Sequence, residues 1–137
     1  MSQTVDIPKE LIDKIRKFRL QPDASSAALV VKIDRKTLSM IEDEKYDNIE
    51  MEDLAEELPG HEPRFVVLSY EKKYSDGRRK YHFVILNWCP PGIQTGLLTL
   101  YTSALINFKN TVDIQTVIEA REGSEGLTKE FVETELK

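Results

Sequence analysis

The segment from Tyr81 to Lys109 constrains the fold more than any other part of the chain. Its first part, Tyr81–Trp88, is aromatic, aliphatic and β-branched with almost no polar interruption, which is typical of a strand covered on both faces. Two prolines and a glycine follow at 90–92 and end the strand, because proline lacks a backbone donor and glycine permits a turn. The sequence after this break predicts a long helix.

The two faces of this predicted helix differ in chemistry. One face carries apolar side chains at helical spacing and is expected to be buried. Its members are Leu97, Tyr101, Ala104 and Phe108, flanked by Leu100 and Leu105. The opposite face carries hydroxyl groups, one bare aliphatic side chain and no charge. Its members are Thr95, Thr99, Thr102, Ser103 and Ile106. Such a surface is either an ordinary solvated helix face or a flat contact face for a partner.

Hydrophobic patterns along the rest of the chain predict one mixed α/β domain spanning residues 1–137. The expected sheet has about five or six strands, with antiparallel hairpins, one long crossover and helices on both faces. The predicted elements are a helix that Asp6 caps, strands at Ala27–Ile33 and Thr37–Ile41, a charged loop at Glu42–Asp47, a short helix at Met51–Leu58, strands at Arg64–Tyr74 and Arg79–Trp88, the long helix, a strand at Val112–Ala120 and a terminal helix at Leu127–Leu136.

Two clusters of basic residues stand out in a chain whose formal net charge is −5. The first lies on the predicted N-terminal helix and comprises Lys9, Lys14, Arg16, Lys17 and Arg19. The second lies at the end of a hairpin with an Asp-Gly turn and comprises Lys72, Lys73, Arg78, Arg79 and Lys80. Each cluster is either a solvated, charge-protected surface or an electrostatic contact for an acidic partner. The sequence leaves both interpretations open.

Composition argues against several classes of protein. The net charge of −5 does not suit a protein that coats nucleic acid or an anionic membrane. No apolar run approaches the roughly 20 residues of a membrane-spanning helix, and the first residues lack the apolar segment of a secretory signal. The single cysteine, Cys89, excludes an internal disulfide and fits a buried small hydrophobe in a reducing, cytoplasmic compartment.

Motifs for catalysis are missing from the sequence. His61 and His82 share no local motif with a nucleophile, and Gly92 and Gly96 are too isolated to form a phosphate-binding loop. A lone cysteine offers no metal-ligand spacing. The chain is therefore interpreted as a binding module without cofactor or metal, and an enzyme on an α/β scaffold is the more distant alternative.

An ordered series of short motifs resembles the actin-depolymerising-factor homology domain, the fold of cofilin. The strand exit Trp88-Cys89-Pro90 and Tyr101 on the following helix carry the resemblance. Further segments are similar to glia maturation factor, a branch of that fold: Arg16–Arg19, Lys32–Asp34, Glu57–Pro59, Pro63–Phe65, Ser69–Tyr70 and Asp76–Arg78. The resemblance extends from Val5 to Leu136, nearly the whole chain.

The resemblance implies a non-enzymatic regulator of the actin cytoskeleton. Glia maturation factors bind the actin-related protein 2/3 complex, inhibit branched actin nucleation and promote filament debranching. The resemblance also implies a monomer in the cytoplasm, at cortical sites of branched actin and in the nucleus. The alternative is a cofilin-like protein that binds actin monomers or filaments and severs filaments.

The resemblance implies two binding surfaces. The first would enter a groove on an actin-related subunit and comprises Ser2, Lys17, Arg19, Thr95, Thr99, Thr102, Ser103 and Ile106. The second would contact the first actin subunit of the daughter filament and comprises Lys72, Lys73, Arg78, Arg79, Lys80, His82, Glu130 and Glu133. Phosphorylation of Ser2 would add negative charge and act as a switch.

Two leucines depart from the cofilin pattern. Leu98 and Leu105 lie on the long helix where actin-binding cofilins commonly carry lysines or polar residues. Missing cations would weaken docking on acidic actin, which favours the glia maturation factor branch. Leu105 also departs from that branch.

Overall fold

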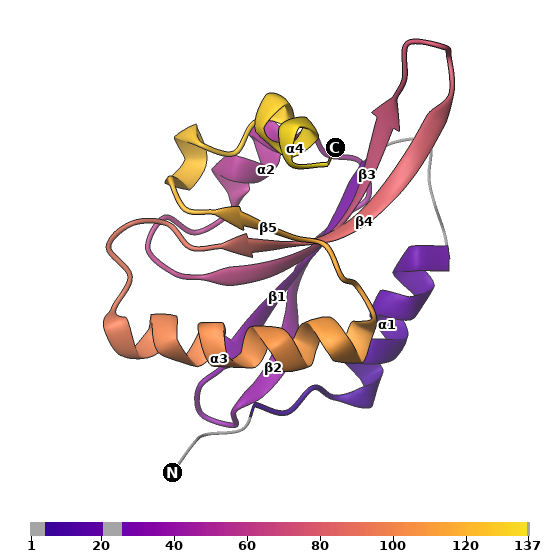
Figure 1. Ribbon diagram of the computed structural model, residues 1–137. Coiled ribbons are helices and arrows are strands. Elements are labelled where there is room, and N and C mark those ends of the chain that lie inside the picture. The colour runs from indigo at the N-terminus through magenta and orange to yellow at the C-terminus, as the bar shows by residue number, and fades with distance from the viewer. Residues whose placement is uncertain (1–4, 21–25, 137) are drawn as a thin grey trace.

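A five-stranded mixed sheet separates two layers of helices in the computed structural model, which describes residues 5–20 and 26–136 (Figure 1). The strand order is β2-β1-β3-β4-β5, and only the β4–β5 pair is parallel. The elements are α1 (Lys9–Leu20), β1 (Ala27–Asp34), β2 (Ser39–Tyr46), α2 (Met51–Glu57), β3 (Arg64–Lys73), β4 (Arg79–Trp88), α3 (Thr95–Val112), β5 (Val117–Ala120), a 3₁₀ turn at Gly123–Glu125 and α4 (Lys129–Glu135). The predicted mixed α/β sheet with a long crossover helix is confirmed.

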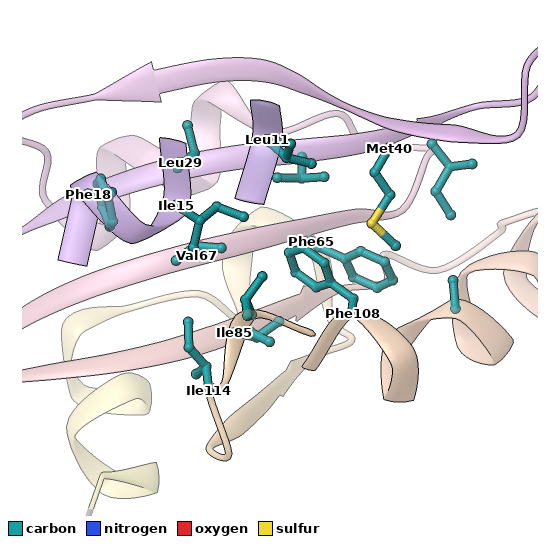
Figure 2. Packing of buried hydrophobic residues seen from close by; sticks show 14 of the residues in the cluster. Leu11, Ile15, Phe18, Leu29, Met40, Phe65, Val67, Ile85, Phe108 and Ile114 are labelled. Atoms are coloured by element: carbon teal, nitrogen blue, oxygen red, sulfur yellow. The ribbon is translucent and has the colours of Figure 1, made fainter. Parts of the chain in front are cut away.

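Each face of the sheet has its own hydrophobic core. Helices α1 and α3 cover one face, where Phe65 stacks on Phe108 with ring centroids 5.3 Å apart (Figure 2). Helices α2 and α4 cover the other face, which buries Val66 and Trp88. Because neighbouring residues of a strand point to opposite faces, both faces of β3 and β4 must be apolar where helices cover them. This explains the nearly continuous apolar run that ends at Trp88.

Tyr101 joins the long helix to the end of a sheet ladder. Pairing between β1 and β3 ends at Val31–Phe65. Beyond that point the backbone N–H of Ile33 donates to the Tyr101 hydroxyl at 2.8 Å. Pro63, which precedes β3, has no N–H with which to extend the ladder. The tyrosine therefore positions α3 across the sheet and satisfies a buried backbone donor.

The second strand is longer than predicted. The sequence 42–47 was expected to loop out, but β2 continues to Tyr46 and begins only at Ser39. This strand lies at the edge of the sheet, so its charged side chains remain in solvent or pair with neighbours. The Glu42 carboxylate lies 3.5 Å from the Lys14 ammonium, and the Asp43 carboxylate lies 3.7 Å from the Lys32 ammonium. The many charged residues of this segment led to the prediction of a loop, but a strand at the edge of the sheet can carry them.

The predicted strand at Val112–Ala120 is also wrong in its first half. Helix α3 includes Val112, which is buried, and Asp113 ends the helix in the left-handed conformation with φ 57°. The strand β5 starts only at Val117. Val112 is therefore the last residue of a helix and Ile114 follows the helix C-cap; both are buried, but neither belongs to a strand.

At the C-terminus, Thr128 caps α4 by accepting the N–H of Phe131 at 3.1 Å.

Candidate partner-binding surfaces

The outward face of α3 lies where the sequence pattern predicted it. All five of its predicted members are exposed: Thr95, Thr99, Thr102, Ser103 and Ile106. Ile106 is the most exposed large hydrophobic residue of the described chain, at 69%. The Ser103 hydroxyl donates to the carbonyl of Thr99 at 3.0 Å, so it is satisfied within the helix. None of the five side chains is charged, and Ser103 can be removed from water without losing its hydrogen bond.

A groove beside this face was not predicted. It has a volume of about 370 Å³ and lies between α3, the turn that precedes it and the β4–β5 edge. Leu98, Thr102 and Leu105 line it from the helix, and Pro91 and Arg121 line it from the other side. Leu98 remains 38% exposed. The helical spacing of Leu98, Thr102 and Leu105 could have indicated the helix side of the groove. The opposite wall depends on the pairing of β4 with β5, which local sequence does not reveal.

Cys89 belongs to the wall of the same groove. Its thiol is half-buried and lies 3.5 Å from Oδ1 of Asn87. Burial, with a smaller contribution from Glu119, raises the pKa of this thiol. The thiolate is therefore disfavoured. Cys89 was predicted to be buried, but the structure leaves it only half-buried at the groove.

Arg19 has a structural role that the sequence did not indicate. Its guanidinium Nη1 donates to the carbonyls of Val112 at 3.1 Å and Asp113 at 3.3 Å, at the C-terminal end of α3. The same group lies 5.5 Å from the centroid of the Phe83 ring. A cation at a helix C-terminus satisfies otherwise unpaired carbonyls and opposes the helix dipole. Arg19 therefore stabilises the packing of α1 against the C-terminal end of α3.

The other predicted members of the first surface are dispersed. Lys17 is exposed on α1 and lines a hollow with Glu42 and Lys45 of β2, because it lies about 200° round the helix from Arg19. Thr95 begins α3, and the helix of 18 residues is about 27 Å long at about 1.5 Å per residue. Ser2 lies outside the described residues. The described members of this predicted surface therefore lie on two helices, and a partner that contacts both Lys17 and Thr95 must reach from α1 to the start of α3.

The second predicted surface begins at the β3–β4 hairpin, which extends beyond the helical layers (Figure 1). Lys72 lies directly opposite Lys80, and Lys73 lies directly opposite Arg79. Strand alternation places the Lys72–Lys80 pair on the face of the sheet that α2 and α4 cover, and the Lys73–Arg79 pair on the face of α1 and α3. Like charges directly opposite one another destabilise a hairpin.

Tyr74 lies among the hairpin cations, although the sequence reasoning did not single it out. The Lys72 ammonium is 5.4 Å and the Arg78 guanidinium 5.9 Å from its ring centroid. Its hydroxyl lies 3.3 Å from Nε2 of His82. Burial, then Lys80 and Lys72, lower the pKa of His82, because each disfavours the charged imidazolium. The sequence Lys72-Lys73-Tyr74, in which an aromatic residue follows two cations, could have indicated this role of Tyr74.

The two predicted acidic members lie on α4. The Tyr70 hydroxyl donates to Oε2 of Glu133 at 2.6 Å, and Tyr70 is the cross-strand partner of His82. Burial and Glu133 raise the pKa of Tyr70, so its hydroxyl stays a donor. Glu130 is exposed one turn earlier on the helix. The structure thus brings Glu133 to the base of the hairpin.

Neither a metal centre nor a membrane span is evident in the part of the chain that the structure describes. Within residues 5–20 and 26–136, no cluster of histidine, cysteine and carboxylate side chains is arranged to hold a metal ion. No helix in those ranges combines the length and hydropathy needed to cross a bilayer.

A mixed sheet between two helical layers, with one long helix exposed along its outer face, defines an actin-depolymerising-factor homology domain. The solution structure of glia maturation factor from Caenorhabditis elegans matches with a TM-score of 0.82 and 28% identity, over 98% of this chain and 99% of that one. The profile of the family "Cofilin/tropomyosin-type actin-binding protein" matches residues 4–137.

Curated relatives narrow the family further. Glia maturation factor of Drosophila melanogaster is 33% identical over 136 residues, which cover 99% of this chain and 98% of that protein. Glia maturation factor beta of Homo sapiens is 31% identical over 131 residues, covering 96% of this chain and 92% of that protein. The chain therefore belongs to the glia maturation factor branch of the cofilin-type actin-binding family. The predicted resemblance is confirmed.

Proposed function

We propose that this protein binds the actin-related protein 2/3 complex, inhibits branched actin nucleation and promotes loss of existing branches. The observation that carries the proposal is the outward face of α3, where Ile106 is 69% exposed among small hydroxyl side chains. The relatives named glia maturation factor support the choice of branch. The protein acts as a monomer without a cofactor, in the cytoplasm at cortical branched actin and in the nucleus.

The chemistry of α3 suits insertion of a helix into an apolar groove. Full burial of a side chain such as Ile106 or Leu98 contributes about 1.5–3 kcal/mol before the costs of association. Thr99 and Ser103 add little bulk, so the helix backbone can approach a partner closely. Leu98 and Leu105 stand where the cofilin pattern has lysines or polar residues, which disfavours the cofilin-like alternative.

The hairpin provides the second contact in this proposal. Its opposed cations, Lys72 with Lys80 and Lys73 with Arg79, give this end of the molecule a positive charge that attracts acidic groups of the first actin subunit of the daughter filament. Arg78 and His82 belong to the same surface, and Glu130 and Glu133 extend it onto α4. Simultaneous contact with the complex and the daughter filament gives a mechanism for weakening the branch junction.

Purified actin-related protein 2/3 complex is the first reagent for a test. A pull-down of the complex should be run beside co-sedimentation with filamentous actin at the same salt concentration. We expect binding to the complex with little binding to filaments. Filament binding and severing without binding to the complex would instead establish the cofilin-like function.

A matched pair of variants tests the role of α3. Ile106→Asp places a charge on the outward face and should weaken binding to the complex by at least about tenfold, the cost of losing one buried apolar contact. Asn107→Asp adds the same charge at an exposed position about 100° further round the helix and should have a smaller effect. Equal losses in both variants would remove the α3 face from the proposal.

Ser2 enters the proposal as a phosphorylation site. A doubly charged group at this position would repel an acidic groove, so Ser2→Glu should bind the complex more weakly than Ser2→Ala. Equal binding by the two variants would argue against the switch.

A further inference from the structure

The two faces of the hairpin end hold their cations differently. On the face of α1 and α3, the Lys73 ammonium lies 4.0 Å from the Glu71 carboxylate, which compensates part of the charge of Lys73 and Arg79. On the face of α2 and α4, Lys72 lies directly opposite Lys80. None of the ion pairs formed within residues 5–20 and 26–136 includes Lys72 or Lys80. The excess positive charge is therefore concentrated on one face.

Aromatic and imidazole groups organise the uncompensated face. Tyr74 lies beside the Lys72 ammonium at 5.4 Å, and its hydroxyl is 3.3 Å from His82 Nε2. The Arg78 guanidinium is held by Asp76, at 2.6 Å, and lies 5.9 Å from the same ring. We call Lys72, Tyr74, Arg78, Lys80 and His82 the hairpin array. The array offers the ammonium groups of Lys72 and Lys80, which form no ion pair within the described residues, next to an imidazole that can accept a proton.

Uncompensated positive charge lies at the turn end of this array, because Arg78 already neutralises Asp76 there, and a carboxylate of α4 lies at the other end. Glu133 accepts the hydroxyl of Tyr70, the cross-strand partner of His82, and so lies toward the body of the protein. Lys72 and Lys80 lie further along the hairpin toward its turn. The surface therefore runs from negative at α4 to positive at the hairpin end. A complementary partner must place its acidic groups against the end of the hairpin, which fixes one orientation.

We propose that the hairpin array binds a carboxylate-rich segment of a protein partner, that the opposite Lys73–Arg79 face does not, and that His82 takes up a proton when this segment binds. The inference deepens the second contact of the proposed function and rests on it for the identity of the partner. Its chemical basis is charge complementarity: carboxylates between Lys72 and Lys80 replace a like-charge repulsion with two attractive interactions.

The proton uptake follows from the groups that face His82. These are Lys72 and Lys80 on its own face of the hairpin, the Tyr74 hydroxyl, and Tyr70 with its bound Glu133. In the free protein, burial and the two lysines lower the pKa of His82. Bound carboxylates oppose the effect of the lysines and raise that pKa. Binding of the acidic segment therefore strengthens as the pH falls through the range in which bound His82 takes up its proton, and stops strengthening once free His82 is protonated as well.

Two double variants with the same charge change separate the faces. Lys72→Gln with Lys80→Gln and Lys73→Gln with Arg79→Gln each remove two positive charges from directly opposed hairpin positions. The readout is the debranching rate of preformed branched filaments, measured beside binding of the isolated complex. We expect the first variant to slow debranching by about tenfold or more, the second by less than about threefold, and both to retain binding to the complex. Equal slowing by both variants would overturn the inference.

A peptide probe tests the inference even if the proposed function fails. Hexaglutamate is titrated into the full-length protein, and the signals of the His82 ring and of the hairpin amides are followed by NMR at several pH values. We expect shifts on the hairpin array and an upward movement of the His82 titration midpoint. Equal shifts on both faces, or an unchanged midpoint with peptide bound, would overturn it. Absence of debranching by the wild-type protein, with the expected peptide response, would refute only the proposed function.

Discussion

The outer face of α3 and the hairpin array are two surfaces built on opposite physical principles. The α3 face is uncharged and lies on a helix that Tyr101 and Phe108 anchor in the core. The hairpin array is cationic and extends beyond the core, held mainly by strand pairing. The first surface can gain affinity by removing apolar area from water, and the second by attracting opposite charge. The comparison shows that one small domain can place a short-range apolar contact on one surface and a longer-range electrostatic contact on another.

The largest expected effect comes from removing the buried side chain that holds α3 against the sheet. Phe108 is fully buried and stacks on Phe65, so Phe108→Ala should lower the free energy of unfolding by about 3–5 kcal/mol. Denaturant unfolding measures this loss. The hairpin variant Lys80→Gln, at an exposed position, should change stability by less than about 0.5 kcal/mol. A comparable loss in Lys80→Gln would mean that the hairpin is part of the stabilising core.

A second prediction concerns the salt dependence of binding. Surface charges separated by more than about 10 Å are screened at 0.1 M salt, whereas apolar burial is not. The affinity difference between wild-type protein and Ile106→Ala, which removes apolar area without adding a charge, should therefore persist when salt rises. The difference between wild-type protein and the Lys72→Gln, Lys80→Gln variant should shrink severalfold. Binding assays on branched filaments at increasing ionic strength measure both, and parallel behaviour would contradict the proposed separation.

The basic helix α1 sharpens the comparison, because Arg19 stabilises α3 while Lys17 faces solvent. Arg19→Gln should lower the free energy of unfolding by about 1 kcal/mol, since two carbonyl acceptors at the end of α3 lose a charged donor. Lys17→Gln should change stability by less than about 0.5 kcal/mol and act, if at all, on binding. Thermal and denaturant unfolding of the pair separate the two roles. Equal stability of both variants would show that the Arg19 contacts contribute nothing.

The smallest expected effect is the pH dependence that His82 imparts to stability. Its pKa is lowered in the folded protein, so the unfolded chain binds the proton first. Stability should therefore decline as the pH falls below about 6.5, until the folded form is protonated as well. In His82→Gln this part of the decline should disappear. The matched variant His61→Gln retains His82 and should keep the decline, as unfolding curves at several pH values would reveal.

Local periodicity predicted those parts of the fold that depend on neighbouring residues. The separation of Tyr101 and Phe108 from Ile106 on α3 follows from helical spacing alone, and the structure confirms it. The failures lie where position in the sheet overrides local pattern. Strand β2 accepts charges because it is an edge, and Val112 extends a helix because it reaches the same core as Phe108.

The sequence by itself determined the sheet-and-helix architecture, the uncharged face of α3 and the basic hairpin, because hydrophobic period, turn residues and charge are local properties. Tertiary structure alone decided that Arg19 secures the end of α3, through hydrogen bonds that join residues 93 and 94 positions apart. It also decided that Tyr74 and His82 meet beside Lys72, and that Leu98 and Leu105 line a groove with Arg121. Such contacts depend on how distant segments pack, which no local pattern encodes.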